Sequence, residues 1–341
     1  MSILSNTEVV DRTASIAKVK SLPTLIGSLG VFGSTQLVGS DSIQFDVQQD
    51  GSLYVLEDHL MGVQEKNSTT DTKYDIHTLP LMHQSVSKAL TRQMLSGVRA
   101  FGQEGEEQLS RAIATELEKQ SNHLDLTKEY LMASALIKNQ VSSNVHGVVD
   151  FSSEFSISRP TEDLTDANLL GGLRSAMKKA RSGVNGRGLV QGYTALVSEQ
   201  MWEFLVTSNA LSETYQNGQA FPNGNPLLLN IPELNGHSVF RWGNIDFILY
   251  DQTFQDRAGN VDQVLADDTG VMFPKVTGGS LGSFFAGPSS RIDFQSAPLA
   301  ERYAYSQMGA KRQHVDVESE SNWLPLITAP GAVVDLSFTA A

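Results

Sequence analysis

The chain has 341 residues, which predicts about two domains of roughly 150 residues each. Hydrophobic residues make up 40% of it and 28 residues are glycine, a globular composition that excludes wholesale disorder. The net charge of −13 has the wrong sign for a protein that grips nucleic-acid phosphates or an anionic membrane. The chain has no cysteine, so disulfides, thiolate metal sites and thiol catalysis are excluded.

The N-terminal 40 residues predict an extended arm. Their apolar residues are scattered, and Gly27, Gly30 and Gly33 interrupt any helix. An extended arm needs a docking surface, because its backbone groups are otherwise unpaired. A frayed terminus is the alternative. We expect neither a secretory signal nor a membrane-spanning helix, since this terminus lacks a basic and apolar leader and no run approaches about 18 apolar residues.

A β-hairpin is the clearest local prediction. Ile43, Phe45 and Val47 alternate with polar residues, Asp50-Gly51 follows as a turn signal, and residues 52–56 form a second apolar run. Residues 60–73 are polar from Gln64 onward, which is typical of the exposed tip of a longer loop between strands or of a disordered surface loop.

Residues 104–141 form the most helical stretch. Leu109, Ile113, Leu117 and Leu124 make an apolar stripe at helical spacing, and the stretch contains no proline. Such a helix, at about 1.5 Å per residue, would be a long spine rather than a buried core helix. An interruption or second cap is expected near Asp125.

The remaining residues alternate between helical and strand patterns. We expect a helix capped by Asp166 that ends at Gly183, a strand over 189–197, a short helix capped by Ser198, and a strand over 245–249. Residues 251–300 have loop character, and the C-terminal segment returns to strands near 315–317 and 334–338. Together these elements predict an α+β fold.

The sequence predicts neither an enzyme nor a cofactor or metal site. No histidine forms a compact ligand pattern, although His77 and His83 could meet in space. The glycines at 183, 186 and 188 follow a predicted helix and precede a strand, the reverse of a phosphate-binding loop. The two S-x-x-K tetrads, Ser85–Lys88 and Ser175–Lys178, lack the companion motifs of a serine acyl-transfer enzyme.

Several short motifs lie in a consistent order along nearly the whole chain. They are VRAFG at 98–102, DLT at 125–127, EY at 129–130, AL at 135–136, GVVD at 147–150, EF at 154–155, GNIDF at 243–247 with Tyr250, ES at 318–319, LPL at 324–326 and PGAVV at 330–334. In this order they resemble the lambda-type major capsid proteins (major capsid protein E family) of tailed bacteriophages, which have the Hong Kong 97 capsid fold. Lys138 departs from the family, which tends to have glycine there, and this concerns the local helix geometry.

The resemblance implies a division of the chain. Residues 1–40 would be an N-terminal arm over a neighbouring subunit, 41–80 the extended loop (E-loop), and 81–158 a peripheral domain with the spine helix. Residues 159–300 would be the axial domain around five-fold and six-fold axes, and 301–341 would return to the peripheral domain. The implied inter-subunit contacts are Lys66, Asp71, Lys73, Glu116 and Arg174.

The resemblance also implies partners and a location. The chain would assemble with itself into pentamers and hexamers of an icosahedral head in the host cytoplasm, aided by a scaffold, a portal and a decoration protein. The head would enclose double-stranded DNA without sequence-specific binding, which agrees with the acidic charge. Lys66 and Lys73 are the conceivable donors of an isopeptide cross-link, which we do not expect. The alternatives are an encapsulin-like compartment shell and a serine acyl-transfer enzyme using Ser175 and Lys178.

Overall fold

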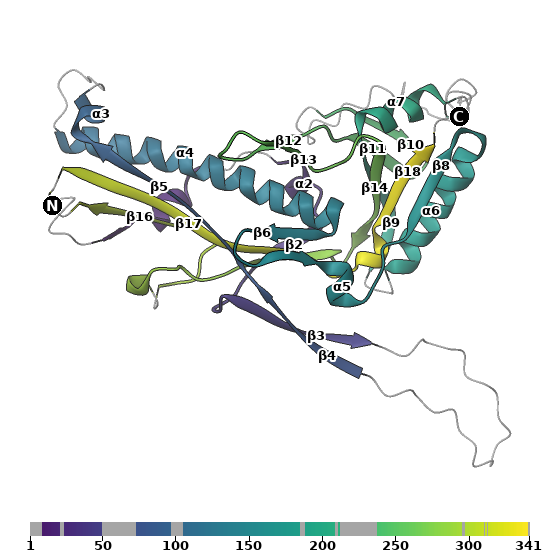
Figure 1. The fold of residues 1–341 in the computed structure, drawn as a ribbon, viewed down its shortest axis with the longest axis horizontal. Coiled ribbons are helices and arrows are strands. Elements are labelled where there is room, and N and C mark those ends of the chain that lie inside the picture. Colours follow the sequence, from purple (N-terminus) through teal and green to yellow (C-terminus); the bar gives the residue numbers. More distant parts are fainter. Residues whose placement is uncertain are drawn as a thin grey trace, which may run out of the picture.

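The computed structural model is organised around one long helix and two six-stranded sheets (Figure 1). It describes residues 9–20, 24–49, 73–96, 105–184, 188–208, 211, 237–294, 297–309, 311 and 313–339. The first sheet has the order β1-β16-β17-β15-β2, with β5 also paired to β17, and the second has the order β10-β11-β9-β14-β18-β8. The predicted mixture of helices and strands is confirmed.

The long helix predicted over 104–141 is α4 (Gly105–Ala133), extended by a π-helical turn at Ser134–Lys138. Ile113, Leu117 and Leu124 are buried along its inner face, as their spacing predicts. Two expectations are corrected. The helix continues without a break at Asp125, and residues 131–137 are buried on all sides because the helix end runs between the two sheets.

The first sheet is built on β17 (His314–Ile327). One edge of β17 pairs with β5 (Met82–Thr91), and the other edge pairs with β16 (Tyr303–Met308) and β15 (Gly282–Ala286). Helix α4 crosses this sheet, where Gln120 donates to the Val317 carbonyl at 3.0 Å and accepts from the Ser319 hydroxyl at 2.6 Å. The buried side-chain bonds fix the helix against the sheet.

The N-terminal segment differs from the expected arm. Within residues 9–40 the chain forms β1 (Val10–Asp11), α1 (Thr13–Ile16), α2 (Leu25–Ser28) and β2 (Phe32–Leu37). Strand β1 pairs with β16 and β2 pairs in parallel with β15, while Ile16, Leu25 and Ile26 are buried. This part therefore docks on its own chain, because its few apolar residues converge on α4 and the sheet.

The second sheet consists of six strands from distant parts of the chain. They are β8 (Thr161–Thr165), β9 (Leu189–Val197), β10 (Val239–Trp242), β11 (Ile245–Leu249), β14 (Thr269–Thr277) and β18 (Val334–Thr339). Helices α6 (Leu169–Gly183) and α7 (Glu199–Thr207) cover one face, and the other face joins the core shared by the first sheet and α4.

Most local predictions for this region are confirmed. Strands β9 and β11 and the end of α6 at Gly183 have the expected bounds, and the Ser198 hydroxyl accepts from the Met201 amide at 3.3 Å as the cap of α7. The predicted cap of α6 is wrong. Asp166 begins a 3-10 turn, Asp166–Asn168, so that Asn168 precedes the helix instead.

Two expectations for the C-terminal part of the chain are corrected. Residues 251–300 were predicted as loop but contain β12 (Thr253–Gln255), β13 (Val261–Gln263), β14 and β15. Strand β14 is buried on both faces, so it shows no alternating pattern. Segment 301–341 divides between the sheets, because β16 and β17 lie in the first and β18 lies between β14 and β8 in the second.

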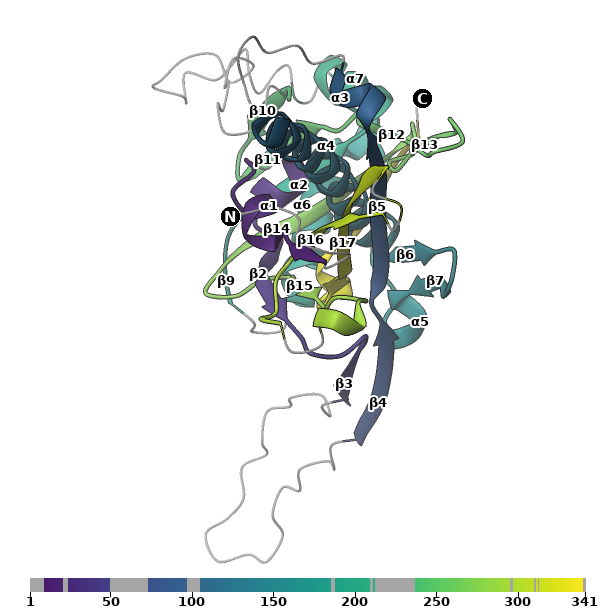
Figure 2. The same cartoon turned by 90° about the vertical axis from the view of Figure 1, so that its left-hand side faces the viewer.

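A two-stranded ribbon projects from the body (Figure 2). It pairs β3 (Ser42–Gln49) with β4 (Lys73–Pro80) over their full length, from Ser42 opposite Pro80 to Gln49 opposite Lys73. The structure thus assigns 73–80, not 52–56, as the partner of the first predicted strand; residues 52–56 lie outside the described residues. Strand β4 runs on into β5, so the ribbon extends an edge strand of the first sheet.

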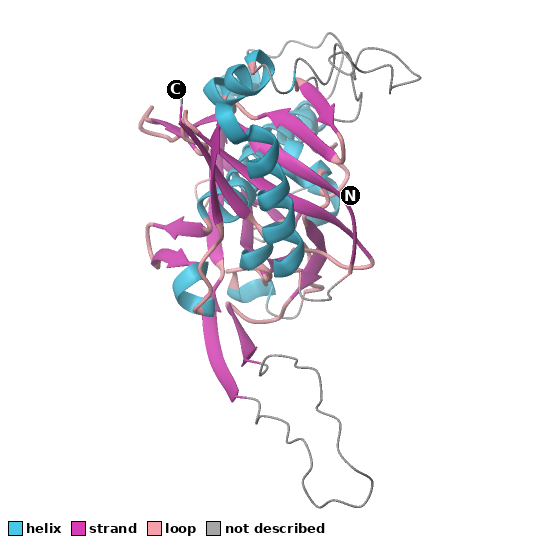
Figure 3. Cartoon of the chain, turned by 90° about the vertical axis from the view of Figure 1, so that its right-hand side faces the viewer, coloured by secondary structure: helices cyan, strands magenta, loops and turns pink. Residues whose placement is uncertain are grey.

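Short elements complete the fold (Figure 3). Helix α3 (Arg92–Ser96) follows β5, and the hairpin of β6 (Gln140–Ser143) and β7 (Gly147–Asp150) leads into α5 (Phe151–Phe155). The 3-10 turns Ile292–Phe294 and Pro330–Ala332 lie in connections. No helix in the described part of the chain is long and apolar enough to cross a membrane.

Candidate interaction surface

The base of the β3–β4 ribbon is anchored to α5. The ring of Phe45 lies 5.9 Å from His77 and 5.4 Å from Phe155, measured between centroids. His77 Nδ1 lies 3.1 Å from a Glu154 carboxylate oxygen. Ile76 is exposed, because neighbouring residues of a strand face opposite sides. The ribbon therefore leaves the body at a fixed point and presents a free apolar side chain.

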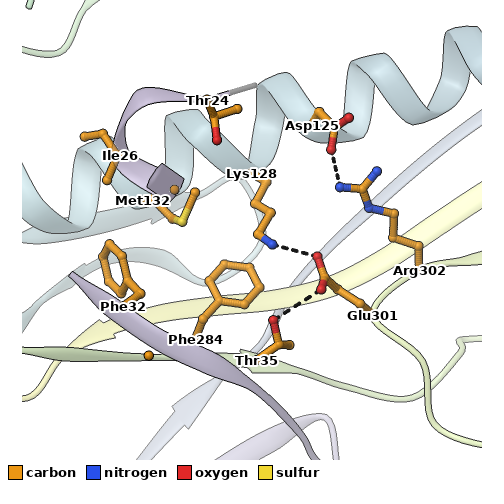
Figure 4. Close-up of a pocket in the computed structure, with 12 residues that line it drawn as sticks. Thr24, Ile26, Phe32, Thr35, Asp125, Lys128, Met132, Phe284, Glu301 and Arg302 are labelled. Carbon is orange, nitrogen blue, oxygen red and sulfur yellow. Dashed lines mark hydrogen bonds and ion pairs between the residues drawn. The ribbon is translucent and has the colours of Figure 1, made fainter. Parts of the chain in front are cut away.

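A charged seam joins the N-terminal segment, α4 and the first sheet (Figure 4). It lines a cavity of about 260 Å³. Lys128 Nζ lies 2.7 Å from Glu301, which also accepts from the Thr35 hydroxyl at 3.2 Å, and Arg302 pairs with the buried Asp125. Burial opposes the charge of Glu301, but Lys128, Arg302 and Thr35 together outweigh it and lower the pKa of that carboxyl. Each charge in the seam has an internal partner.

Glu129 fastens the N-terminal segment beside this cavity. Its carboxylate accepts from the Ile26 amide at 2.8 Å and the Gly27 amide at 3.4 Å. Burial raises the pKa of Glu129, and these backbone hydrogen bonds only partly offset that effect. The carboxylate therefore accepts hydrogen bonds from amides at the start of α2, which have no hydrogen-bond partner within the helix.

Glu320 holds a loop onto β17. Its carboxylate accepts from the Ser289 hydroxyl at 2.6 Å, the Ser290 amide at 3.0 Å and the Tyr305 hydroxyl at 3.0 Å, and also from the Ser290 hydroxyl. Burial opposes the charge, but these donors outweigh it and lower the pKa of Glu320. Burial raises the pKa of Tyr305, and the nearby carboxylate adds to that rise. This network secures the connection between β15 and β16.

Arg159 links the end of the long helix to the second sheet. Its guanidinium donates to the carbonyls of Leu136 at 2.6 Å and Ile137 at 3.0 Å, and it lies 3.2 Å from Asp335 on β18. Burial lowers the pKa of Arg159, and Asp335 partly offsets this. The sequence analysis missed this role, because Arg159-Pro160 reads only as a boundary; the carbonyls it caps are contributed by a helix end 22 residues earlier.

The residues predicted to contact neighbouring subunits lie in different environments in the structure. Glu116 is only 8% exposed and pairs with Lys88 at 3.4 Å, so its side chain makes its contact within its own subunit. Arg174 is exposed on α6. Lys73 begins β4, whereas Lys66 and Asp71 lie outside the described residues.

The serine and lysine tetrads do not form catalytic pairs. The Ser175 hydroxyl donates to Glu162 at 2.7 Å, and Lys179 rather than Lys178 shares that carboxylate. Lys88 pairs with Glu116. Ser175, Lys179 and Lys88 are each held by a carboxylate in a structural contact, so neither lysine activates Ser175 as a nucleophile.

His77 and His83, which could have met in space, have separate partners: His77 lies beside Glu154, and His83 Nδ1 lies 2.7 Å from the Asn322 side-chain oxygen. Over the residues that the structure describes, no group of three or more acidic or histidine side chains could hold a metal ion.

Comparisons with known proteins agree along the whole chain. A major capsid protein of Pseudomonas phage KPP10 is 22% identical over 353 residues, covering 98% of this chain and 97% of that protein. The crystal structure of a prophage capsid protein of E. coli CFT073 matches with a TM-score of 0.64 and 11% identity, covering 97% and 100% of the two chains. The capsid of the cyanophage P-SCSP1u matches with a TM-score of 0.51 and 10% identity, covering 95% and 90%.

The two structural matches show that this fold of mixed helices and strands is one found in phage capsid proteins. The profile of the family described as phage major capsid protein E matches residues 8–338, almost the whole chain. The predicted resemblance is therefore confirmed: the chain belongs to the phage major capsid protein E family.

Proposed function

We propose that this chain, a phage major capsid protein, is the subunit that assembles with itself through pentamers and hexamers into the icosahedral head of a tailed phage. The family match over residues 8–338 carries the proposal. The head encloses double-stranded DNA and is assembled in the host cytoplasm. Because the family and the curated relative are phage capsid proteins, a genome container is favoured over an encapsulin-like compartment for enzymes.

The Hong Kong 97 pattern supplies roles for the two sheets. The first sheet with α4 acts as the peripheral domain, and the second sheet with α6 and α7 acts as the axial domain around five-fold and six-fold axes. The β3–β4 ribbon acts as the base of the E-loop, which lies across an adjacent subunit. Its rigid anchor at Phe45, His77 and Glu154 supports this, because a long reach requires a fixed origin.

Contacts between axial domains involve Arg174. Arg174, Lys178 and Arg181 are exposed at helical spacing on α6, and no carboxylate among the described residues forms an ion pair with them. On a chain with a net charge of −13, such a stripe fits an acidic face of a neighbouring copy. In the E-loop, Lys66, Asp71 and Lys73 contribute contacts, and no isopeptide bond forms.

Other proteins complete the head. A scaffold sets the curvature during assembly, a portal occupies one vertex, and a decoration protein binds the outer surface. The subunit has no cofactor. Its family is a structural one, not a class of enzymes.

Sedimentation of the purified protein, followed by negative-stain microscopy of the fast fraction, tests the proposed function. We expect uniform hollow shells, formed alone or with the products of neighbouring genes. A 37.1 kDa species that stays slow even in their presence would contradict the proposal. A covalent ladder above that mass on a denaturing gel would contradict the absence of cross-links.

A further inference from the structure

One face of α6 carries a stripe of positive charge. Ala176 and Ala180 are buried against the second sheet, so Arg174, Lys178 and Arg181 point away from it and are exposed. Among the described residues, no carboxylate forms an ion pair with these three cations. Like charges four residues apart on a helix repel each other. The stripe therefore weakens the isolated helix slightly, and a counter-charge from another molecule would remove that effect.

The neighbouring lysine on α6 has its counter-charge within the fold. Lys179 Nζ lies 2.6 Å from a Glu162 carboxylate oxygen and donates to the Thr161 carbonyl, also at 2.6 Å. Lys178, the preceding residue, faces solvent. The chain has 38 acidic residues against 25 lysines and arginines, so carboxylates are in excess. The exposed cations of α6 therefore lack partners because of where they lie on the helix, not because acidic groups are scarce.

Helix α7 carries the opposite charge at the same spacing. Met201 and Leu205 are buried against the second sheet, so Glu199 and Glu203 point away from it, and both are exposed. Neither glutamate forms an ion pair with a described residue. Like the cations of α6, they are like charges four residues apart. The exposed faces of the two helices are therefore complementary both in sign and in spacing.

The two helices reach opposite edges of the second sheet, whose edge strands are β8 and β10 (Figure 1). Helix α6 packs on Leu164 of β8. Helix α7 crosses the strand ends, from Phe338 on β18, where Phe204 stacks with centroids 4.8 Å apart, to Phe240 on β10, which lies 4.9 Å from Trp202. Copies that stand side by side around a rotation axis meet through unlike sides. The α6 side of one copy can therefore meet the α7 side of the next.

We propose that Arg174 and Lys178 on α6 of one subunit pair with Glu199 and Glu203 on α7 of a second copy of this chain. The inference rests on the proposed self-assembly, and it names the acidic face that the α6 stripe meets. A second copy is the occupant because the chain itself supplies the required charges at the required spacing. Such pairs orient neighbouring subunits, since a misplaced approach would bring like charges together.

Charge reversal and rescue test the pairing. One variant reverses α6 (Arg174→Glu/Lys178→Glu), a second reverses α7 (Glu199→Lys/Glu203→Lys), and a third combines all four substitutions. Reversal of one helix brings like charges together at every copy of the contact, so the protein concentration needed for shell assembly should rise by about tenfold or more. The combined variant restores opposite charges and should assemble at a concentration within about threefold of wild type.

A control variant and a second readout accompany the test. Arg257→Glu/Lys311→Glu reverses two exposed cations outside α6 and α7, with the same change in net charge as the α6 reversal, and should assemble like wild type. Because the chain has no cysteine, Lys178→Cys/Glu203→Cys can be linked specifically by a short bis-maleimide. Shells of this variant should yield dimers and higher oligomers on a denaturing gel, whereas Lys311→Cys/Glu203→Cys should remain monomeric.

Three outcomes would overturn the proposal. The first is normal assembly of either single-helix reversal, and the second is a combined variant as impaired as the single reversals. The third is intact shells of the cysteine variant on α6 and α7 that yield only monomer. Failure of the wild type as well to form any shell would contradict the proposed function rather than this inference.

Discussion

Two buried glutamates show how local donors decide the state of a carboxyl group. Glu129 and Glu320 are each 1% exposed, so both lose hydration. Burial dominates at Glu129 and raises its pKa, whereas the hydroxyl and amide donors around Glu320 lower its pKa. The two groups therefore affect stability with opposite signs. A raised carboxyl pKa weakens the fold as pH rises, and a lowered one weakens it as pH falls.

The first prediction concerns acid stability. Because Glu320 is held as a carboxylate in the fold, its stabilising contribution is present above about pH 4.3, the ordinary glutamate value, and is lost as pH falls through the lower folded pKa. In urea unfolding of the isolated subunit, Glu320→Gln should show a smaller loss of stability on acidification than wild type. The exposed Glu118→Gln is the control, and equal acid profiles for Glu320→Gln and wild type would refute the prediction.

The second prediction concerns the ion pair of Arg302 and Asp125. Asp125 is buried, and Arg302 also donates to the Ser121 hydroxyl at 3.0 Å. Arg302→Met leaves a buried charge without its partner, and the free energy of unfolding should fall by about 3–5 kcal/mol. Chemical denaturation measures this. The double variant Arg302→Met/Asp125→Asn should recover part of the loss, and a single-variant loss below about 1 kcal/mol would contradict the argument.

At the scale of elements, Asn139 turns the chain at the end of the long helix. Asn139 adopts a left-handed conformation with φ of 56°, and its side-chain amide donates to the Ser152 hydroxyl at 2.7 Å. Asn139 follows the π-helical turn that ends at Lys138, the residue that stands where the family tends to have glycine. The helix can thereby stop and release the chain into β6.

The third prediction separates strain from hydrogen bonding at this helix end. Asn139→Gly and Asn139→Val both remove the bond to Ser152. The left-handed backbone strains valine but not glycine. The free energy of unfolding of the valine variant should therefore be lower than that of the glycine variant by about 1–2 kcal/mol. Thermal and urea unfolding of the pair give the difference. Equal stabilities would show that the helix end rearranges.

The fourth prediction concerns the ribbon anchor. Phe45→Ala removes the ring that contacts His77 and Phe155, so the β3–β4 ribbon should separate from α5 more often. Limited proteolysis of the isolated subunit should cut between 41 and 80 several-fold faster than in wild type. Ile76→Ala, on the exposed face of the same ribbon, is the control. Unchanged cleavage in Phe45→Ala would show that the anchor is dispensable.

At the scale of the whole molecule, charge bears on the relation to the genome. A chain with a net charge of −13 should enclose DNA without gripping it. The fifth prediction is that the free subunit forms no complex with duplex DNA in a filter-binding assay at micromolar concentration, at either about 50 or 200 mM salt. A tight complex that weakens steeply with salt would contradict it.

Patterns among residues close together in the sequence predict much of the fold. The apolar stripe of α4, the alternation in β3, the Ser198 cap and the strands β9 and β11 follow from residues close together in sequence. The partner of β3 could not be read in this way, because the Asp50-Gly51 turn signal competes with a pairing between 42–49 and 73–80. The position of β14 was hidden, since burial on both faces removes its alternation.

The sequence by itself determined the class of the protein: an acidic, cysteine-free α+β chain whose ordered motifs resemble the capsid family to which it belongs. Only the tertiary structure decided that the N-terminal segment docks on its own chain and that β18 joins the second sheet. These are contacts between residues far apart in sequence. Composition and periodicity report on neighbours within a few residues, so they cannot specify which distant surfaces meet.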